Sequence, residues 1–304
     1  MNNLTLKQLR YFEALARQGH FGRAAEVCAI SQPALSMQIR DLEAALGTPL
    51  FERSARQVRL TSLGAAFALR AREILRAVDE LADLARAAQT GLAGQLRIGV
   101  IPTIAPYLLP GILAGLTRAY PDLDLHVREA LTPRLLSELR AGGLDTAIVA
   151  LPVSEPGIDE EPLFTESFVL VRPQAQASDP VPDREGLREM RLLLLEEGHC
   201  FRDQALSFCN MAPNRPRELL DGSSLATLVQ LVGAGIGVTL IPEMALPVET
   251  RSAAVSVARF PDPQPERTIG MVWRRTSPLA PQLRQIGAMV REVGTGGAPP
   301  QAVP

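Results

Sequence analysis

The chain opens with apolar residues at the three- and four-residue spacing of amphipathic helices. This pattern predicts a helix over Leu4–Ala16, ended by Gly19, and a short second helix over Phe21–Val27. Ser31 is a good N-cap for a third helix that stops at Gly47. The core face of this third helix is Leu35, Ile39, Leu42 and Leu46. Two short helices joined by a tight turn, the second amphipathic, predict a helix-turn-helix.

The opposite face of the third helix carries the side chains that we expect to meet DNA. Gln and Ser can hydrogen-bond base edges, and an arginine can reach a phosphate or a guanine. A hairpin wing over residues 51–61 adds three arginines that would follow the DNA backbone. The expected DNA-binding residues are Gln32, Pro33, Ser36, Met37, Arg40, Arg53, Arg56 and Arg59. The alternative is an ordinary three-helix bundle with a charged edge, but cap, polar face and wing together favour DNA binding.

A long helix follows, capped by Thr61 and reaching about Gln89. Its apolar positions alternate at four and three residues, the spacing of a coiled-coil seam. The seam positions are Phe67, Ala71, Ile74, Val78, Leu81, Ala85 and Ala88. Because a lone helix would leave this stripe exposed, we expect it to pair with a second copy of the chain. Gly91 and Gly94 then mark a hinge to the next domain.

After Gln95 the pattern changes to short apolar strands that alternate with helices. This alternation predicts an α/β domain with a mostly parallel sheet. The first lobe has strands over 96–101, 123–129 and 144–150, and helices over 105–119 and 133–141. A second lobe begins near Leu163, with strands over 168–171, 192–195 and 237–241 and a helix over 223–233. A strand over 267–273 and a helix over 278–290 return to the first lobe.

Composition narrows the class of protein. The 304 residues are 46% hydrophobic and 21% charged, which is a globular composition. The sequence has no 18-residue apolar run, and we expect no export signal. The net charge is −2, so DNA binding must be local; residues 1–60 hold eight basic and five acidic side chains. Three cysteines, an odd number, do not form an extracellular disulfide framework and favour a cytoplasmic thiol protein.

Two of the three cysteines flank a predicted helix in the stretch LLLLEEGHCFRDQALSFC, residues 192–209. The leucines predict a buried strand, and the run from Cys200 to Cys209 predicts a helix. Nine helical residues place the two sulfurs on opposite sides and about 13 Å apart along the axis. A disulfide needs Cα atoms within about 7 Å, so the pair could bridge only if the helix melted. The pair is therefore a candidate redox switch; two inert thiols are the alternative.

Cys200 has neighbours that activate a thiol. It would lie in the first turn of the helix, where unpaired N–H groups favour an anion, and Arg202 is two residues on. These settings lower a thiol pKa, and peroxide attacks the thiolate to give a sulfenic acid that a second thiol can capture. We assign Cys200 as the attacking thiol and Cys209 as the resolving thiol.

Four polar residues follow the carboxyl ends of predicted strands, where ligands of open α/β sheets bind. Thr103 follows the first strand, Thr132 follows the second and caps its helix, and His199 and Cys200 follow the leucine strand. Two hydroxyls, an imidazole and a thiolate suit a very small polar oxidant better than a large apolar effector. For the two threonines, simple helix capping is an equal alternative.

The stretch FGRAAEVCAISQPALSMQIRDLEAALGTPLFERSARQVRLTSLG, residues 21–64, resembles the LysR-type transcriptional regulators. The segments GHCFRDQALSFC, VIPTIAPYLLP and PERTIGMVW resemble the peroxide-sensing OxyR branch of that family. The resemblance implies that Cys200 and Cys209 are the redox-active pair. It implies a peroxide pocket of Thr103, Thr132, His199, Arg202, Asp203 and Arg267. Phe201 departs from the family, which has an aliphatic residue there.

The resemblance also implies an organisation and a fold. We expect an α/β protein with a winged helix-turn-helix at 1–60, a dimerisation helix at 61–90, a two-lobed regulatory domain at 91–294 and a flexible tail at 295–304. The lobes should resemble those of periplasmic binding proteins. Family members dimerise through the linker helix, and the resemblance suggests tetramers on DNA.

These observations predict a cytoplasmic, DNA-binding regulator of oxidative-stress genes that senses hydrogen peroxide and is not an enzyme. Its expected partners are double-stranded DNA, hydrogen peroxide, RNA polymerase, further copies of the chain and a cellular thiol reductant, with no cofactor and no membrane. The main alternative is a LysR-type regulator that responds to a small metabolite between the lobes. A thiol peroxidase is disfavoured by the helix-turn-helix. A metal site of His199, Cys200 and Cys209 is disfavoured because it lacks a fourth ligand.

Overall fold

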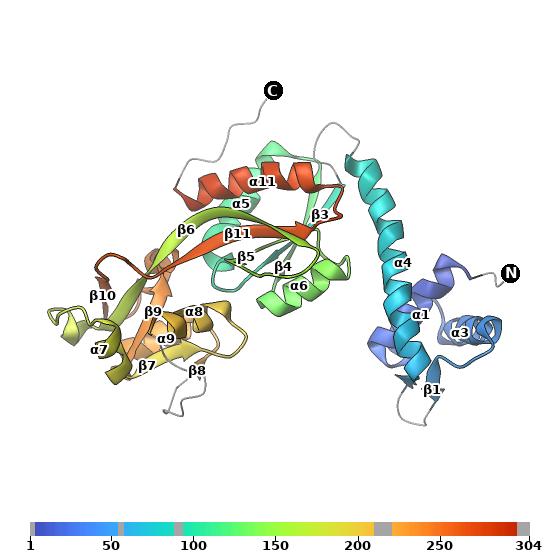
Figure 1. Cartoon of the computed structure of the whole chain (residues 1–304), viewed down its shortest axis with the longest axis horizontal. Helices are drawn as coiled ribbons and strands as arrows, with labels where there is room; N and C mark the ends of the chain where they lie inside the picture. Colours follow the sequence, from blue (N-terminus) through green and yellow to red (C-terminus); the bar gives the residue numbers. More distant parts are fainter. Residues whose placement is uncertain (1–3, 54–57, 88–93, 210–220, 297–304) are drawn as a thin grey trace. The chain divides into compact units, whose positions relative to one another are not determined.

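The computed structural model describes residues 4–53, 58–87, 94–209 and 221–296 (Figure 1). The chain divides into two compact units, Met1–Asp83 and Leu84–Pro304. The helices of the first unit and the linker are α1 Leu6–Gln18, α2 Phe21–Val27, α3 Gln32–Leu46 and α4 Ser62–Ala87, and the strands are β1 Phe51–Arg53 and β2 Val58–Leu60. The winged helix-turn-helix expected from the sequence is therefore confirmed.

Local side chains fix the helix ends of the first unit. Thr5 caps α1 and forms a capping box with Gln8, so the helix starts two residues after the predicted Leu4. Ser31 caps α3 by accepting a hydrogen bond from the Ala34 N–H, as predicted. The three helices enclose a core that includes Phe12, Leu15, Leu35, Ile39 and Leu42.

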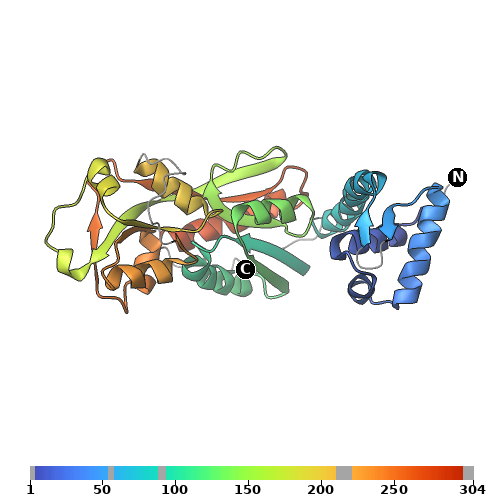
Figure 2. The same cartoon turned by 90° about the horizontal axis from the view of Figure 1, so that it is seen from below.

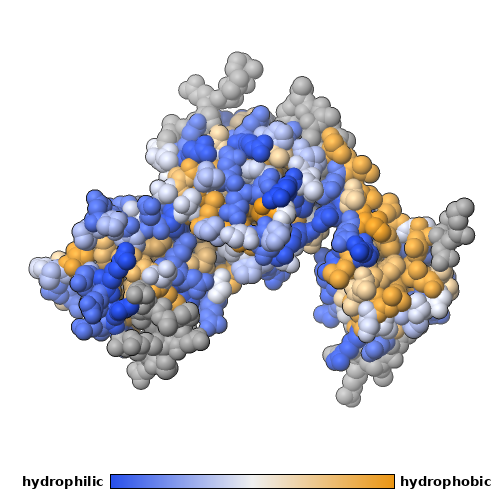
Figure 3. Space-filling view, viewed as in Figure 1, coloured by the Kyte–Doolittle hydropathy of each residue, from blue (hydrophilic) through white to orange (hydrophobic). Residues whose placement is uncertain are grey.

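Helix α4 does not use its predicted seam as one continuous surface. Its 26 residues span about 39 Å, and Thr61 caps it by accepting from the Gly64 N–H. Phe67 meets the Phe12 ring edge-on at 4.9 Å and Ala71 is buried, so these two seam positions belong to the core of their own chain. The large exposed apolar side chains along the helix are Leu63, Leu69, Ile74, Leu81 and Leu84. Figure 3 shows apolar surface, in orange, over this helix. The side chains of Ala85 and Ala88, and Gly91, lie outside the described residues.

The second unit is built on one mixed sheet in the order β4-β3-β5-β11-β6-β9-β7-β8, with β10 paired to β6. Its strands are β3 Gly94–Val100, β4 Leu123–Glu129, β5 Thr146–Leu151, β6 Ile158–Pro173, β7 Leu192–Leu195, β8 Asp221–Gly222, β9 Val238–Pro242, β10 Val255–Arg259 and β11 Glu266–Arg274. Its helices are α5 Ala105–Ala119, α6 Thr132–Arg140, α7 Arg184–Glu189, α8 Cys200–Phe208, α9 Leu225–Gly233, α10 Leu246–Glu249 and α11 Ala280–Gly294, with short 3-10 turns at Gln174–Gln176 and Glu243–Ala245.

The expectation of a mostly parallel sheet is wrong at its centre. Strands β3, β4 and β5 pair in parallel in the first lobe, and β7 pairs in parallel with β8 and β9 in the second. The two strands between them, β6 and β11, are antiparallel to each other along the nine residues of β11. They must run in opposite directions because the chain crosses from the first lobe to the second in β6 and returns in β11. The expected start of the second lobe, Leu163, lies inside β6.

Each lobe has its own core. In the first, α5 and α11 pack together on one face of the sheet and α6 lies on the other (Figures 1 and 2). In the second, α8 and α9 lie on opposite sides of the strands (Figure 2). The two cores contain the apolar side chains of the predicted strands, among them Ile98, Val100 and Ile148 in the first lobe and Leu193, Leu194 and Leu240 in the second.

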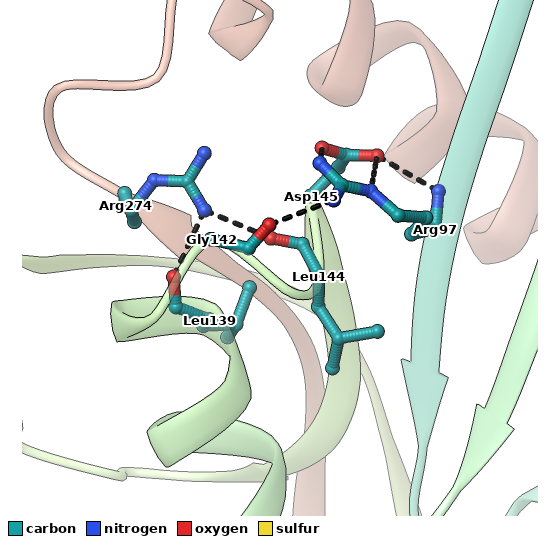
Figure 4. Close-up of polar contacts among 6 residues, drawn as sticks. All are labelled: Arg97, Leu139, Gly142, Leu144, Asp145 and Arg274. Carbon is teal, nitrogen blue, oxygen red and sulfur yellow. Dashed lines mark hydrogen bonds and ion pairs between the residues drawn. The ribbon is translucent and has the colours of Figure 1, made fainter. Parts of the chain in front are cut away.

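A buried ion pair holds the turn that leads into β5 (Figure 4). Arg97 donates two side-chain hydrogen bonds to the fully buried Asp145, at 2.7 and 3.2 Å, and a third to the Gly142 carbonyl. Arg274 donates to the carbonyls of Leu139 and Leu144 at 2.9 and 2.8 Å. These contacts tie Arg97 and Arg274 to Asp145 and to backbone carbonyls of the first lobe, which indicates a structural role.

Candidate functional site

The cysteine-bearing segment folds as predicted. The leucine strand β7 is fully buried and leads through a turn into α8, where Cys200 is the first residue and Cys209 is the C-cap. Cys209 has helical backbone angles, φ −73° and ψ 0°, so the helical spacing of about 13 Å between the two positions holds. All three cysteines in the described part of the chain are free. A Cys200–Cys209 bridge therefore requires α8 to unwind.

The two thiols of α8 have different surroundings. Cys209 is fully buried in the core of the second lobe. Burial raises the pKa of its thiol to about 11, although the nearby Arg188 and Arg184 act in the opposite direction. Cys200 is half-buried and packs against the core of the first lobe, so it lies where the two lobes meet. Of this pair, Cys200 is the thiol that a solute can reach.

The residues around Cys200 are held by the end of β7. The Arg202 guanidinium is buried and its Nη1 donates to the Leu195 carbonyl at 2.7 Å, which fixes the first turn of α8 to the strand. His199 is the N-cap residue, and burial lowers the pKa of its imidazole while Glu196 acts in the opposite direction. Asp203 is exposed in the first turn, where its charge suits the helix dipole.

One backbone hydrogen bond and one close contact bring the two threonine segments and the cysteine turn together. The Ala130 N–H donates to the Val100 carbonyl at 3.2 Å, which holds the start of α6 beside the end of β3. Gly198 lies against the residue before Thr132, because a Cβ added to it would be 3.1 Å from Leu131 Cδ1. Its φ of +95° is also one that residues with a side chain rarely adopt. The turn before Cys200 therefore approaches the N-terminus of α6 closely.

Thr132 is not the cap of its helix. The N-cap of α6 is Leu131, and Thr132 is the first helical residue, so the predicted capping role is wrong. Its Oγ1 is buried and has no hydrogen-bond partner among the described residues. A buried hydroxyl without a partner costs about 1–3 kcal/mol, so its position calls for an explanation other than stability. A small polar ligand at this position would satisfy it.

Thr103 is buried and contacts Arg267. Its Oγ1 accepts a hydrogen bond from Arg267 Nη1 at 2.8 Å, and its carbonyl accepts from Nη2 at 3.1 Å. Capping does not explain Thr103, since the N-cap of α5 is Ile104. A hydroxyl that accepts from a guanidinium keeps its own proton available to donate to a ligand.

Arg267 is the centre of a buried cluster that joins both lobes. It forms an ion pair with Glu166 and its Nε donates to Glu166 Oε1 at 2.7 Å. Its guanidinium also lies over the Phe201 ring, 5.4 Å from the centroid, one residue from Cys200. Burial raises the pKa of Glu166, and Arg267 acts in the opposite direction. The cluster positions Arg267 through Glu166, Thr103 and Phe201.

The sequence reasoning missed two carboxylates of this region. Glu166 lies 101 residues from Arg267 in the chain, inside the long strand β6. The sequence of this strand contains no motif that marks Glu166 as part of a site. Glu249 accepts a hydrogen bond from the Tyr107 hydroxyl at 2.7 Å, across the lobes. Neither residue stands in a local motif, so only the fold identifies them. Among the described residues there is no group of three or more side chains that could hold a metal ion.

The predicted DNA-contacting face of α3 is exposed. Gln32, Pro33, Met37 and Arg40 are exposed and Ser36 is half-buried. Arg40 Nη2 donates to Ser36 Oγ at 3.2 Å, so the two polar side chains are already aligned along the helix. In the wing Arg59 is exposed, while the Arg53 side chain and Arg56 lie outside the described residues. None of the helices described is long and apolar enough to cross a membrane.

Comparison with known families also divides the chain into an N-terminal DNA-binding part and a C-terminal regulatory part. Residues 6–65 match the model of the bacterial regulatory helix-turn-helix protein, lysR family. Residues 89–295 match the LysR substrate binding domain.

Individual relatives span nearly the whole chain. A probable hydrogen peroxide-inducible genes activator of Streptomyces viridosporus is 44% identical over 95% of this chain and 94% of its own. The structure of a full-length OxyR variant from Pseudomonas aeruginosa has a TM-score of 0.76 at 37% identity, covering 99% of both chains. A hydrogen peroxide-bound mutant of Corynebacterium glutamicum OxyR has a TM-score of 0.65 at 38% identity, covering 96% of this chain and 93% of that one. The chain therefore belongs to the LysR family of bacterial regulators and, within it, to the group that contains the OxyR proteins.

Proposed function

We propose that this protein is a transcription regulator that senses hydrogen peroxide through Cys200 and records the event as a Cys200–Cys209 disulfide. The observation that carries the proposal is the placement of the thiols at opposite ends of α8. Cys200 lies where the lobes meet, and the turn before it approaches the start of the helix that carries the unpartnered Thr132 hydroxyl. Cys209 is buried. This arrangement supports a thiol that meets an oxidant and a second thiol that reacts only after the helix changes.

The first step is attack by the Cys200 thiolate on one oxygen of hydrogen peroxide. The new S–O bond forms as the O–O bond breaks, and the departing hydroxide takes a proton to become water. Peroxide both donates and accepts hydrogen bonds, so the hydroxyls of Thr103 and Thr132 and the imidazole of His199 can hold it. Arg267 supplies positive charge to that side of the pocket through Thr103. Arg202 and Asp203 belong to the first turn of α8, the turn that begins with Cys200.

The second step forms the disulfide. The Cys209 thiolate attacks the Cys200 sulfur, the S–O bond breaks, and hydroxide leaves and is protonated to water. Because the two Cα atoms must approach to within about 7 Å, α8 has to unwind for this step. A cellular thiol reductant would return two electrons and reset the pair.

The remodelled second lobe would then act on DNA through the oligomer. In this proposal residues 61–90 join two copies of the chain, residues 91–294 sense the oxidant, and residues 1–60 bind double-stranded DNA through the exposed face of α3 and the wing. A changed arrangement of the copies alters the spacing of the DNA-binding units and their contact with RNA polymerase, in the cytoplasm.

The chemistry can be tested by thiol mapping with mass spectrometry after treatment with one equivalent of hydrogen peroxide. We expect a Cys200–Cys209 bridge with Cys28 still free. Cys209→Ser should stop at a sulfenic acid on Cys200 that a dimedone probe labels, and Cys200→Ser should give neither product. Oxidation of Cys28 alone, or of no cysteine, would rule out the switch.

The link to DNA needs a separate measurement. Reduced and oxidised protein should protect different lengths of the same operator in a footprint. Identical footprints would contradict the proposal. Full induction by Cys200→Ser in cells would point instead to a small metabolite bound between the lobes.

A further inference from the structure

Helix α7 contacts the C-terminal end of α8, next to the buried thiol of Cys209. Arg188, in the last turn of α7, donates from Nε to the Cys209 carbonyl at 2.9 Å. Cys209 is the C-cap of α8, and its carbonyl is one of those that a helix end leaves without an internal partner. A cationic donor suits this position both as a hydrogen-bond partner and against the helix dipole.

A second arginine of α7 holds the neighbouring residue. The Arg184 guanidinium lies over the Phe208 ring, 5.0 Å from its centroid. The same ring meets Phe260 edge-on at 5.2 Å. The last helical residue and the C-cap of α8 are thus held to α7, one through its ring and the other through its backbone. We call Arg184 and Arg188 the arginine clamp.

The other end of α8 is also anchored. Phe201 is buried, meets Phe168 edge-on at 4.9 Å and lies under Arg267. Arg202 is also buried and is fixed to the Leu195 carbonyl. Both ends of α8 are therefore anchored, and the arginine clamp is the anchor beside Cys209.

We propose that the arginine clamp sets how readily Cys209 captures the sulfenic acid on Cys200, and so sets the redox potential of the pair. This inference rests on the proposed disulfide switch. Because both contacts require Cys209 and Phe208 at the end of an intact α8, they stabilise the reduced, helical form and not the bridged form. The clamp does not touch the step in which peroxide oxidises Cys200.

An electrostatic role of Arg184 and Arg188 would change the rate of disulfide formation in the opposite direction. Their charges oppose the effect of burial on the Cys209 thiol, which would favour the reactive thiolate. If that effect governed capture, removing an arginine would slow the reaction. If the clamp governs it, removing an arginine speeds the reaction, because the helix end is released. The sign of the change in rate therefore separates the two roles.

The test compares Arg188→Met and Arg184→Met in the full chain with the wild type. After a pulse of hydrogen peroxide, conversion of Cys200 sulfenic acid to disulfide should be about five- to tenfold faster in Arg188→Met, the size of one net hydrogen bond. The reduction potential should become more negative, by about 30 mV for a tenfold change in the equilibrium. The rate of sulfenic acid formation should stay at the wild-type value in both variants.

Two matched variants guard the interpretation. Arg191→Met removes the same charge from an exposed side chain just after α7 and should behave as the wild type. Arg188→Lys keeps a cationic donor, so it should convert the Cys200 sulfenic acid to the disulfide at nearly the wild-type rate. Arg184→Met tests the clamp independently if Arg188→Met does not give a native circular dichroism spectrum.

The outcomes separate the clamp from the switch on which it rests. Unchanged or slower capture in Arg188→Met and Arg184→Met, with a bridge still forming in the wild type, overturns the clamp alone. If the wild type forms no Cys200–Cys209 bridge, both the proposed disulfide switch and the proposed role of the arginine clamp are wrong.

Discussion

Single residues on α8 differ in their surroundings more than the sequence indicates. The helical spacing of Cys200 and Cys209 is readable from the sequence, and so is the position of Cys200 after a strand. The depth of Cys209 is not, because it depends on the core of the second lobe, which is assembled from segments far apart in the chain. The burial that protects Cys209, the predicted resolving thiol, is therefore known only from the fold.

Alkylation should distinguish the two thiols. In the reduced, folded protein at pH 8, we expect iodoacetamide to label Cys200 well before Cys209, whose thiol is buried and has a pKa of about 11. Mass spectrometry of timed samples measures both rates, and unfolding in urea should remove the difference. Equal rates in the folded protein would contradict the described burial of Cys209.

His199 should make stability depend on pH. Burial lowers the pKa of His199 below its ordinary value of 6.5. Just below pH 6.5 the unfolded chain therefore takes up a proton that the folded chain does not, so the free energy of unfolding falls as the pH falls. The free energy of unfolding, measured with urea between pH 5 and 7.5, should change less steeply with pH in His199→Gln than in the wild type. His126→Gln, at an exposed ring, is the control, and equal slopes in wild type and His199→Gln would refute the expectation.

The site residues show where sequence reasoning stops. Thr103, Thr132, His199 and Cys200 were expected in one region because each follows a strand, and the contacts of Gly198 and Ala130 draw their segments together. Arg267 could not be placed from the sequence, since its partner Thr103 is 164 residues away. The roles of these side chains in binding peroxide stay predictions.

Among the elements, the turn between β7 and α8 depends most on one residue. Gly198 has a φ of +95° and little space beside Leu131. Gly198→Ala should strain the turn, destabilise the fold by about 1 kcal/mol, and displace Cys200, so that peroxide oxidises Cys200 more slowly. Stopped-flow kinetics and thermal unfolding measure the two effects.

A matched glycine separates strain from displacement. Gly235 also has a positive φ, +77°, but an added Cβ would meet nothing within 4 Å. Gly235→Ala should lower stability by a similar amount and leave the reaction of Cys200 with peroxide unchanged. If both variants react with peroxide at the wild-type rate, the approach of Gly198 to Leu131 does not position Cys200.

Element boundaries followed from the sequence wherever a local signal marks them. Ser31 and Thr61 begin their helices as predicted, because a hydroxyl that accepts an N–H bond acts over three residues. The central antiparallel pair was missed because strand direction is set by the crossing between lobes, which leaves no local pattern in β6 or β11. The seam positions Phe67 and Ala71 were misassigned because periodicity does not tell which partner covers an apolar face.

At the scale of the whole molecule, the exposed apolar side chains of α4 should govern self-association. Leu81 is 65% exposed, and a charge there should not disturb the core of its own chain. Leu81→Glu should lower the mass measured by sedimentation, because two copies could no longer bury this stripe. Val248→Glu, at an exposed apolar side chain of α10, is the control. An unchanged mass in Leu81→Glu would exclude this face of α4 as the interface.

The two strands that join the lobes also limit how the regulatory domain can move. Strands β6 and β11 are hydrogen-bonded to each other along the whole of β11. The lobes are therefore connected by two paired strands and not by two separate loops. A clamshell closure around a ligand would have to bend or twist both strands together. Movement of one lobe against the other is therefore confined to deformations that keep these two strands paired.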